Sequence, residues 1–245
     1  MKQTRLIMGM PITIEIIDPG VTEENLQEIF NYFQYIDDKF STYKSTSEIS
    51  QINACLLLSK DFSQDMQTVL RLCEQTKKET SGYFDISHNG KLDPSGLVKG
   101  WAIYQAANLL KKKGFSNFYV EAGGDIQVAG KNKDHGYWTI GIRNPFNREE
   151  IIKKLKVFDK GVATSGTYIR GQHVYNPKVK DAKLEEVVSL TVIGPNIYEA
   201  DRFATAAFAM GKRGIHLIEK LPEFAGYLVD KEGTATFTSN FKQYL

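Results

Sequence analysis

The chain has 245 residues, 42% of them hydrophobic, and is long enough to bury a sizeable core as one domain or as two closely packed lobes. Its 31 basic and 29 acidic residues leave a formal net charge of +2 with the signs interspersed. This balance argues against nucleic acid or an anionic membrane surface as a partner, so any charged ligand must be bound by local side chains.

Cysteine content and the N-terminal segment indicate the compartment. Cys55 and Cys73 have no metal-ligand spacing, so we expect two reduced, largely apolar side chains and no disulfide framework. The N-terminal segment lacks the continuous apolar stretch of a signal peptide, and no run reaches the ~18 apolar residues of a membrane span. We therefore expect a cytoplasmic protein without a transmembrane segment if the chain is complete. A trimmed form of an exported protein fits the same sequence.

The first half of the chain predicts one strand followed by two amphipathic helices. Residues 10–18 alternate apolar and polar side chains, the period of a half-buried strand, which ends at Pro19-Gly20. A helix is predicted after a Thr22 cap and a second one after Ser63, the latter ending at Ser81-Gly82. The inward-facing positions are Leu26, Ile29, Phe30, Phe33 and Phe40 in the first helix, and Met66, Val69, Leu70 and Cys73 in the second.

The second half is rich in strands. A third helix is predicted from about Leu97 to residues 111–114, where lysines and a glycine suit a helix C-terminus. A fourth helical segment covers residues 199–221. Strands are predicted in FYVEAGGDIQVAG, YWTIGIR, KLKVFD, VVSLTVIG, AGYLVD and ATFTS. Because helices and strands do not alternate strictly, we predict an α+β fold, largely antiparallel, with residues 1–245 as a single domain.

Asp201 and Thr205 form the first candidate site. Their spacing of four places both oxygens on one helix face, one turn apart. A carboxylate and a hydroxyl, with a backbone carbonyl or water, suit Mg²⁺ or Ca²⁺ and suit zinc poorly. The structural alternative is an aspartate that interacts with the helix dipole. Small side chains nearby, Ala204 and Ala206 among them, keep the helix slim and allow another backbone to approach.

Residues 161–177, GVATSGTYIRGQHVYNP, form the second candidate site. The stretch is too polar for a core and too rich in glycine for a regular strand, so we predict a functional loop. His173 lies among polar, turn-forming neighbours and is of the type that takes a proton from an alcohol as a general base. The alternative is a surface or hydrogen-bonded histidine. The pair Gly123-Gly124 permits either a tight turn or close approach of the backbone to a ligand.

Residues 91–100, KLDPSGLVKG, precede the third helix and form the third candidate site. Asp93 can accept hydrogen bonds from an imide or ribose, Gly96 can present a carbonyl to a metal, and Lys99 can bring a charge to a phosphate. The free amides of the helix start also favour an anion. The structural alternative is a capped helix with a surface lysine.

These motifs together resemble the ApbE family of flavin transferases (FAD:protein FMN transferases). The resemblance runs through nine segments in the same order: MGMPITIEI, IDDKFSTYKSTSEISQIN, GYFDIS, LDPSGLVKGWA, VEAGGDIQVAG, WTIGIRNP, VATSGTY, QHVYNP and EADRFATAAFAMG. It implies an α+β protein with two intimately associated lobes that binds FAD and Mg²⁺. It also implies transfer of FMN from FAD to a threonine or serine hydroxyl of a partner flavoprotein, which carries a short Asp-containing, Ser/Thr-Ala-Thr-like motif, with release of AMP.

The resemblance also implies roles for residues at matching positions. His173 matches the base that activates the acceptor hydroxyl. The residues implied to contact FAD are Met8, Tyr43, Phe84, Asp85, Asp93, Lys99 and Tyr175, and those implied to hold the metal are Gly96, Asp201 and Thr205.

The chain departs from the family pattern in two segments. Only a short turn, HNGK, separates GYFDIS from LDPSGLVKG, where relatives commonly insert further elements. Asn176 replaces the usual aspartate before Pro177, and the glycine expected after that proline is absent. Two other functions therefore stay open: hydrolysis of FAD to FMN and AMP, and binding of FAD without catalysis.

Overall fold

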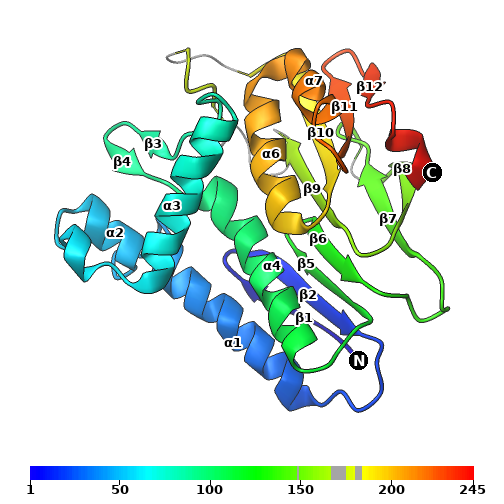
Figure 1. Ribbon diagram of the computed structural model, residues 1–245, viewed down its shortest axis with the longest axis horizontal. Coiled ribbons are helices and arrows are strands. Elements are labelled where there is room, and N and C mark those ends of the chain that lie inside the picture. The colour runs from blue at the N-terminus through cyan, green and yellow to red at the C-terminus, as the bar shows by residue number, and fades with distance from the viewer. Residues whose placement is uncertain (148, 167–174, 180–183) are drawn as a thin grey trace.

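A large antiparallel sheet forms the centre of the computed structural model, which describes residues 1–147, 149–166, 175–179 and 184–245 (Figure 1). Its eight strands lie side by side in the same order as in the chain, and each pair of neighbours is antiparallel. The strands are β1 (Lys2–Ile7), β2 (Met10–Ile16), β5 (Phe118–Ala122), β6 (Asp125–Ala129), β9 (Gly161–Gly166), β10 (Val187–Gly194), β11 (Ala225–Asp230) and β12 (Ala235–Phe237).

Helices and two small hairpins are inserted between these strands. The α-helices are α1 (Glu23–Phe40), α2 (Glu48–Asn53), α3 (Gln64–Glu79), α4 (Ser95–Lys112), α6 (Ile197–Ala209) and α7 (Gly214–Glu219), and the 3₁₀ turns are η1 (Ser59–Asp61), η2 (Gly211–Arg213) and η3 (Phe241–Tyr244). The hairpins pair β3 (Ser87–His88) with β4 (Lys91–Leu92) and β7 (Trp138–Arg143) with β8 (Ile151–Val157). Among the helices of the described residues, none has the length and apolar character needed to span a bilayer.

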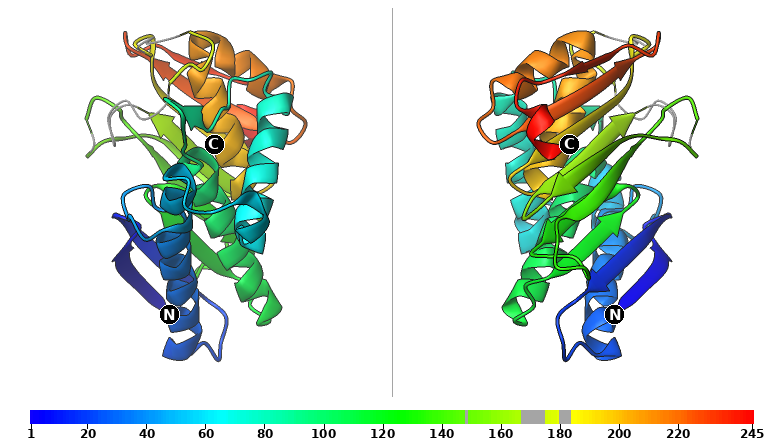
Figure 2. Two further views of the ribbon diagram at one scale, coloured as in Figure 1. Left: turned by 90° about the vertical axis from the view of Figure 1, so that its left-hand side faces the viewer. Right: turned by 90° about the vertical axis from the view of Figure 1, so that its right-hand side faces the viewer.

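The sheet has a hydrophobic core on each face. The larger core contains the inner side chains of α1, α3, α4 and α6 with those of one sheet face. The smaller core lies between the opposite face and the β7–β8 hairpin. Strands β6 and β11 are consequently buried along their whole length, whereas β7 alternates between buried and exposed residues. The N-terminal hairpin lies at one end of the elongated molecule and the C-terminal strands at the other (Figure 2).

The predicted caps and apolar stripes of the first two helices are confirmed. Thr22 Oγ1 accepts a hydrogen bond from the amide of Asn25 at 3.3 Å, and Ser63 Oγ accepts one from the amide of Met66 at 3.3 Å. The inward positions predicted for α1 are all buried, as are those predicted for α3 except Leu70, which is half-buried. Helical period therefore located both helices correctly.

Residues 161–166 are a strand, so the prediction that this stretch is too glycine-rich for one was wrong. Strand β9 lies between β6 and β10. A Cβ atom on Gly161 would lie 2.0 Å from the backbone nitrogen of Ile197, the first residue of α6. The glycine is therefore needed because a helix start crosses the strand here, and it does not indicate a loop.

The fourth helical segment is two helices, and the third helix begins earlier than predicted. The predicted segment at 199–221 begins at Ile197 and breaks at residues 210–213, where the chain turns from α6 into α7. A Cβ on Gly214 would lie 1.8 Å from the carbonyl oxygen of Ala207, so the glycine permits this reversal. Helix α4 begins at Ser95 rather than near Leu97.

Candidate active site

A cleft opens where the start of α4 meets α6, the end of β9 and the segment that follows α3. It contains most of the residues singled out from the sequence, although its lining comes from six separate parts of the chain. Its lining residues are Tyr83, Phe84, Asp85, Ile86, Asp93, Ser95, Gly96, Lys99, Gly123, Thr164, Ser165, Gly166, Tyr175, Pro177, Asp201 and Thr205. The fold therefore brings the third candidate site and the Asp201–Thr205 pair together.

Close packing of α4 against α6 forms the floor of the cleft. The amide of Gly100 donates to Asp201 Oδ2 at 2.8 Å, and a Cβ on Gly100 would lie 2.6 Å from the Asp201 Cβ. One turn away, Thr205 Oγ1 donates to the carbonyl oxygen of Gly96 at 3.3 Å. Asp201 and Thr205 thus share the helix face that their spacing predicted, and Ala204 is buried as the slim-helix argument requires.

Lys99 lies between two buried carboxylates. Its ammonium forms an ion pair with Asp125 and lies 3.5 Å from Asp201 Oδ1. Asp125 is 1% exposed and Asp201 is 3% exposed. Burial raises the pKa of Asp201 to about 7, and the neighbouring Asp125 acts in the same direction, against the opposing effects of Lys99 and the Gly100 amide. The cleft therefore keeps one cation close to a carboxylate that is costly to ionise.

Asp125, which the sequence did not single out, pairs with the cleft residue Lys99. It begins β6 directly after the Gly123-Gly124 turn, and its Oδ1 accepts a hydrogen bond from the amide of Thr164 at 3.0 Å. The two glycines have φ values of 59° and 95°, so they form the tight turn of a hairpin. The sequence signal that could have identified Asp125 was a carboxylate directly after a Gly-Gly turn, at the start of a buried strand.

The oxygens around Asp201 suit a hard divalent cation. The Gly96 carbonyl and the Thr205 hydroxyl are hydrogen-bonded to each other and line the same cleft as the Asp201 carboxylate, and such an all-oxygen set is typical of Mg²⁺. Within the described ranges, 1–147, 149–166, 175–179 and 184–245, no three His, Cys, Asp or Glu side chains gather as a metal site. A cation here would have one carboxylate and would depend on waters and ligand phosphates for further contacts, as Mg²⁺ commonly does.

A second wall of the cleft is polar and aromatic. Asp93 Oδ1 accepts a hydrogen bond from the Ser95 amide at 3.0 Å, and the Asp93 amide donates to the Ile86 carbonyl at 2.8 Å. The Tyr175 hydroxyl donates to the Asp85 carbonyl at 2.9 Å. Burial raises the pKa of Tyr175 to about 12, with the charges of Asp85 and Asp93 adding to the effect. Tyr175 therefore remains a neutral donor at physiological pH.

Two implied site residues that the structure describes, Met8 and Tyr43, do not line the cleft. Met8 lies in the turn between β1 and β2 with φ of 57°, and Tyr43 is 98% exposed in the segment after α1. His173, the implied base, lies outside the described residues. The structure thus brings together Phe84, Asp85, Asp93, Gly96, Lys99, Tyr175, Asp201 and Thr205.

The fold and the cleft define an α+β protein whose site gathers several carboxylates, one lysine and further oxygens, a set of groups that suits a hard divalent cation. The sequence model of the ApbE family matches residues 8–91 and 87–228. The chain therefore belongs to the ApbE family, and the resemblance noted in the sequence is confirmed.

Curated relatives and solved structures agree with this assignment. The FAD:protein FMN transferase of Vibrio cholerae is 25% identical to this chain, and the match covers 97% of this chain and 90% of the relative. That of Haemophilus influenzae is 24% identical and covers 93% and 87%. The flavin transferase ApbE structure from Vibrio cholerae superposes with a TM-score of 0.86 at 23% identity, over 100% of this chain and 99% of that one.

The ApbE protein of Thermotoga maritima gives a TM-score of 0.88 at 20% identity and covers 100% of this chain and 98% of its own. These structural likenesses confirm the α+β fold with a large antiparallel sheet. The two stretches matched by the family model meet at residues 87–91, within the β3–β4 hairpin. This is the short HNGK turn at which the chain departs from the family pattern.

Proposed function

We propose that the protein is an Mg²⁺-dependent transferase that moves FMN from FAD to a threonine or serine hydroxyl of a partner flavoprotein and releases AMP. One observation carries the proposal: Lys99 lies 3.5 Å from Asp201 in a cleft that also contains Asp93, Gly96 and Thr205. Membership of the ApbE family and the names of the curated relatives support flavin transfer.

The proposed reaction breaks the phosphoanhydride bond of the pyrophosphate and forms a phosphoester bond to the acceptor. The acceptor hydroxyl oxygen forms a bond to the FMN phosphorus, and the bond from that phosphorus to the bridging oxygen breaks. AMP leaves with the bridging oxygen. Because AMP is already a good leaving group, no further acid is required. Both halves of the pyrophosphate are negatively charged, and displacement at phosphorus therefore depends on neutralisation of that charge.

The residues of the cleft fit this chemistry. Lys99 would neutralise a phosphate, and Asp93 with Tyr175 would orient the nucleotide or the flavin ring. Gly96 O, Asp201 and Thr205 would hold Mg²⁺, which supplies Lewis-acid charge stabilisation when bound. His173 would accept the proton of the acceptor hydroxyl. Met8 and Tyr43 would contact the flavin from outside the lined part of the cleft.

The experiment combines the purified protein with FAD, Mg²⁺ and a peptide that carries the Asp-containing Ser/Thr-Ala-Thr-like motif. We expect a fluorescent peptide that carries covalently bound flavin and whose mass has increased by one FMN unit, together with an equal amount of AMP. FMN in place of FAD is the matched control, because it has no AMP to lose. Absence of product, while a curated relative labels the same peptide, would contradict the proposal.

Hydrolysis of FAD is the second candidate, and the shortened β3–β4 hairpin favours it because this segment borders the cleft wall at residues 83–86. The same assay without peptide decides between the two. Equal amounts of FMN and AMP from FAD and Mg²⁺, with no labelled peptide when it is present, would identify a hydrolase. Binding of intact FAD without either product would identify a non-catalytic flavin-binding protein.

A further inference from the structure

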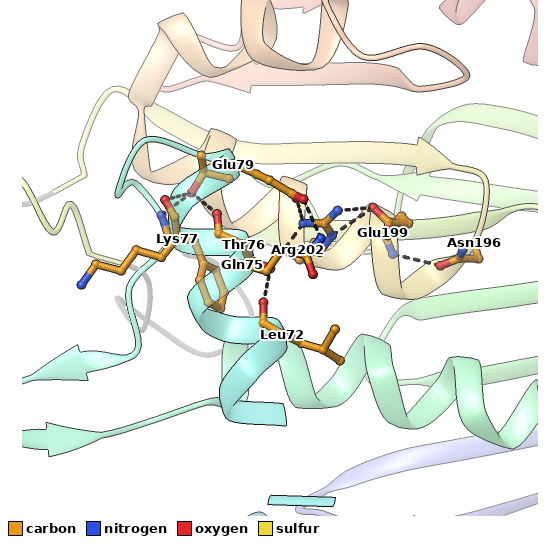
Figure 3. A network of polar contacts seen from close by, with 10 residues as sticks. Leu72, Gln75, Thr76, Lys77, Glu79, Asn196, Glu199 and Arg202 are labelled. Atoms are coloured by element: carbon orange, nitrogen blue, oxygen red, sulfur yellow. Dashed lines mark hydrogen bonds and ion pairs between the residues drawn. The ribbon is translucent and has the colours of Figure 1, made fainter. Parts of the chain in front are cut away.

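Gly96, Asp201 and Thr205, the residues proposed to hold the metal, are called the metal seat. Arg202 directly follows Asp201 in the chain but lies on a different face of α6. Successive helical residues are rotated by about 100°, so Asp201 contacts α4 while Arg202 contacts the end of α3. Arg202 is only 5% exposed. Figure 3 shows its guanidinium at the centre of a polar network between α3 and α6. A single turn of α6 thus serves the cleft floor on one face and holds a neighbouring helix on the other.

The guanidinium of Arg202 uses all three of its nitrogens. Nε and Nη2 donate to Glu199 Oε2 at 2.9 and 2.6 Å, which fixes the side chain to its own helix. Nη1 donates to Thr76 Oγ1 at 3.3 Å and to Glu79 Oε2, both on α3. Thr76 is free to accept because its own hydroxyl proton goes to the Leu72 carbonyl at 2.8 Å. The forked geometry of arginine is therefore what joins the two helices.

The end of α3 continues directly into the cleft wall. Thr80 Oγ1 donates to the carbonyl of Thr76 at 2.7 Å and accepts a hydrogen bond from the Phe84 amide at 3.1 Å. The Phe84 ring in turn packs beside Gly96, where an added Cβ would lie 3.5 Å from its Cε2 atom. An unbroken series of contacts thus leads from Arg202 through Thr76 and Thr80 to the wall opposite the metal seat.

We propose that Arg202 is a positioning residue: by tying the end of α3 to α6, it holds the cleft wall at residues 83–86 against the seat formed by Gly96, Asp201 and Thr205. The identity of the ligand that this wall meets, FAD, rests on the function proposed above. The placement of the wall does not, because every contact in the series lies within the protein.

Hydrogen exchange of the Phe84 amide tests the placement without any ligand. Arg202→Met keeps the apolar stem of the side chain and removes the guanidinium. We expect exchange at Phe84 to become about tenfold faster while exchange in α1 stays unchanged, because only the local opening of the wall is made easier. Exchange at Phe84 within twofold of the wild-type rate, in a folded variant, would overturn the proposal.

Two further variants keep this test decisive. Glu79→Gln removes a charge from a side chain that is 36% exposed and is expected to fold even if Arg202→Met does not, with faster exchange at Phe84 in the same direction. Lys39→Met is the matched control, since it removes a similar ion pair, to Glu48 at 2.9 Å, near the opposite end of α3. Equal acceleration at Phe84 in the control would show a general loss of stability and would also overturn the proposal.

Binding and kinetics test the consequence for FAD. In Arg202→Met we expect the FAD dissociation constant and KM to rise about tenfold, with kcat changed by less than about threefold, because the wall binds substrate and does not react. Mn²⁺ binding measured without FAD should stay within about twofold, as Asp201 is retained. An equal loss of Mn²⁺ affinity would assign Arg202 to the metal seat instead. If wild-type protein binds no FAD, the proposed function fails, and hydrogen exchange alone decides the role of Arg202.

Discussion

Lys99 and Asp201 form an ion pair where α4 packs against α6, with the ammonium nitrogen 3.5 Å from the carboxylate Oδ1. The lysine proposed to meet phosphate and the carboxylate proposed to hold the metal are thus already in contact. Asp125 pairs with the same ammonium, so one positive charge is shared by two buried negative charges. This net negative charge is unfavourable for the protein alone and favourable for a bound cation.

Asp201→Asn should make the protein more stable and less active. The variant keeps an oxygen to accept the Gly100 amide hydrogen bond but leaves Lys99 and Asp125 as a neutral pair. We expect the melting temperature, measured without metal, to rise by about 2–4 °C, which corresponds to about 1 kcal/mol for a chain of this size. FAD turnover at limiting Mg²⁺ should fall by at least about 100-fold. A lower melting temperature together with retained turnover would show that the carboxylate serves the fold and not the metal.

Asp125→Asn should weaken the binding of Mg²⁺. The substitution removes a negative charge near the seat and leaves Lys99 to pair with Asp201 alone, where it competes with the cation. Both effects act in one direction, and we expect the apparent Mg²⁺ dissociation constant to rise about fivefold, or about 1 kcal/mol. Titration of turnover with Mg²⁺ measures it. Asp134→Asn, at an exposed turn away from the cleft, is the control and should leave the constant unchanged.

The elements that sequence predicted well are those whose own side chains determine them. Thr22 and Ser63 cap their helices through local hydrogen bonds, and the apolar period of α1 is visible without any knowledge of its neighbours. Strand β9 was missed because the need for a glycine at position 161 comes from close contact with the start of α6, which is distant in sequence. Propensity carries no information about such a contact, since the requirement comes from a different element.

The same distinction applies to the site. The closeness of Asp201 and Thr205 was predicted correctly because helical spacing alone places them on one face of α6. Asp125 was missed because its partner Lys99 is 26 residues away in the chain and meets it only when α4 packs beside β6. Arg202 was overlooked for the same reason, because its hydrogen-bond partners on α3 lie more than one hundred residues earlier in the chain.

Gly100→Ala should lower the stability of the protein. The added Cβ would lie 2.6 Å from the Asp201 Cβ and 3.0 Å from the Ile197 carbonyl oxygen, so α4 and α6 must separate. Overpacking of this kind costs about 1–3 kcal/mol of the free energy of unfolding, which urea denaturation measures. Gly136→Ala is the control, because the nearest atom to its Cβ would be 3.9 Å away, and we expect a change within about 0.5 kcal/mol. Similar losses in both variants would contradict tight packing at the cleft floor.

Glu48 should make stability depend on pH at the start of α3. Burial opposes its ionisation, but hydrogen bonds from Ser63 and Lys39 outweigh burial and hold the pKa of Glu48 below its ordinary value. Because the folded-state pKa is the lower one, the stabilisation is present above the ordinary value of 4.5 and is lost as pH falls through the folded-state pKa.

We therefore expect Glu48→Gln to be less stable than the wild type by about 1 kcal/mol at pH 7, measured by urea denaturation, with the difference shrinking steadily below about pH 4.5. Glu74→Gln is the control, since Glu74 forms an exposed pair with Lys78 at 3.6 Å that contributes little. A difference between the wild type and Glu48→Gln that stays constant down to pH 3 would show that shape rather than charge holds this contact. Glu48 would then cap α3 without sensing pH.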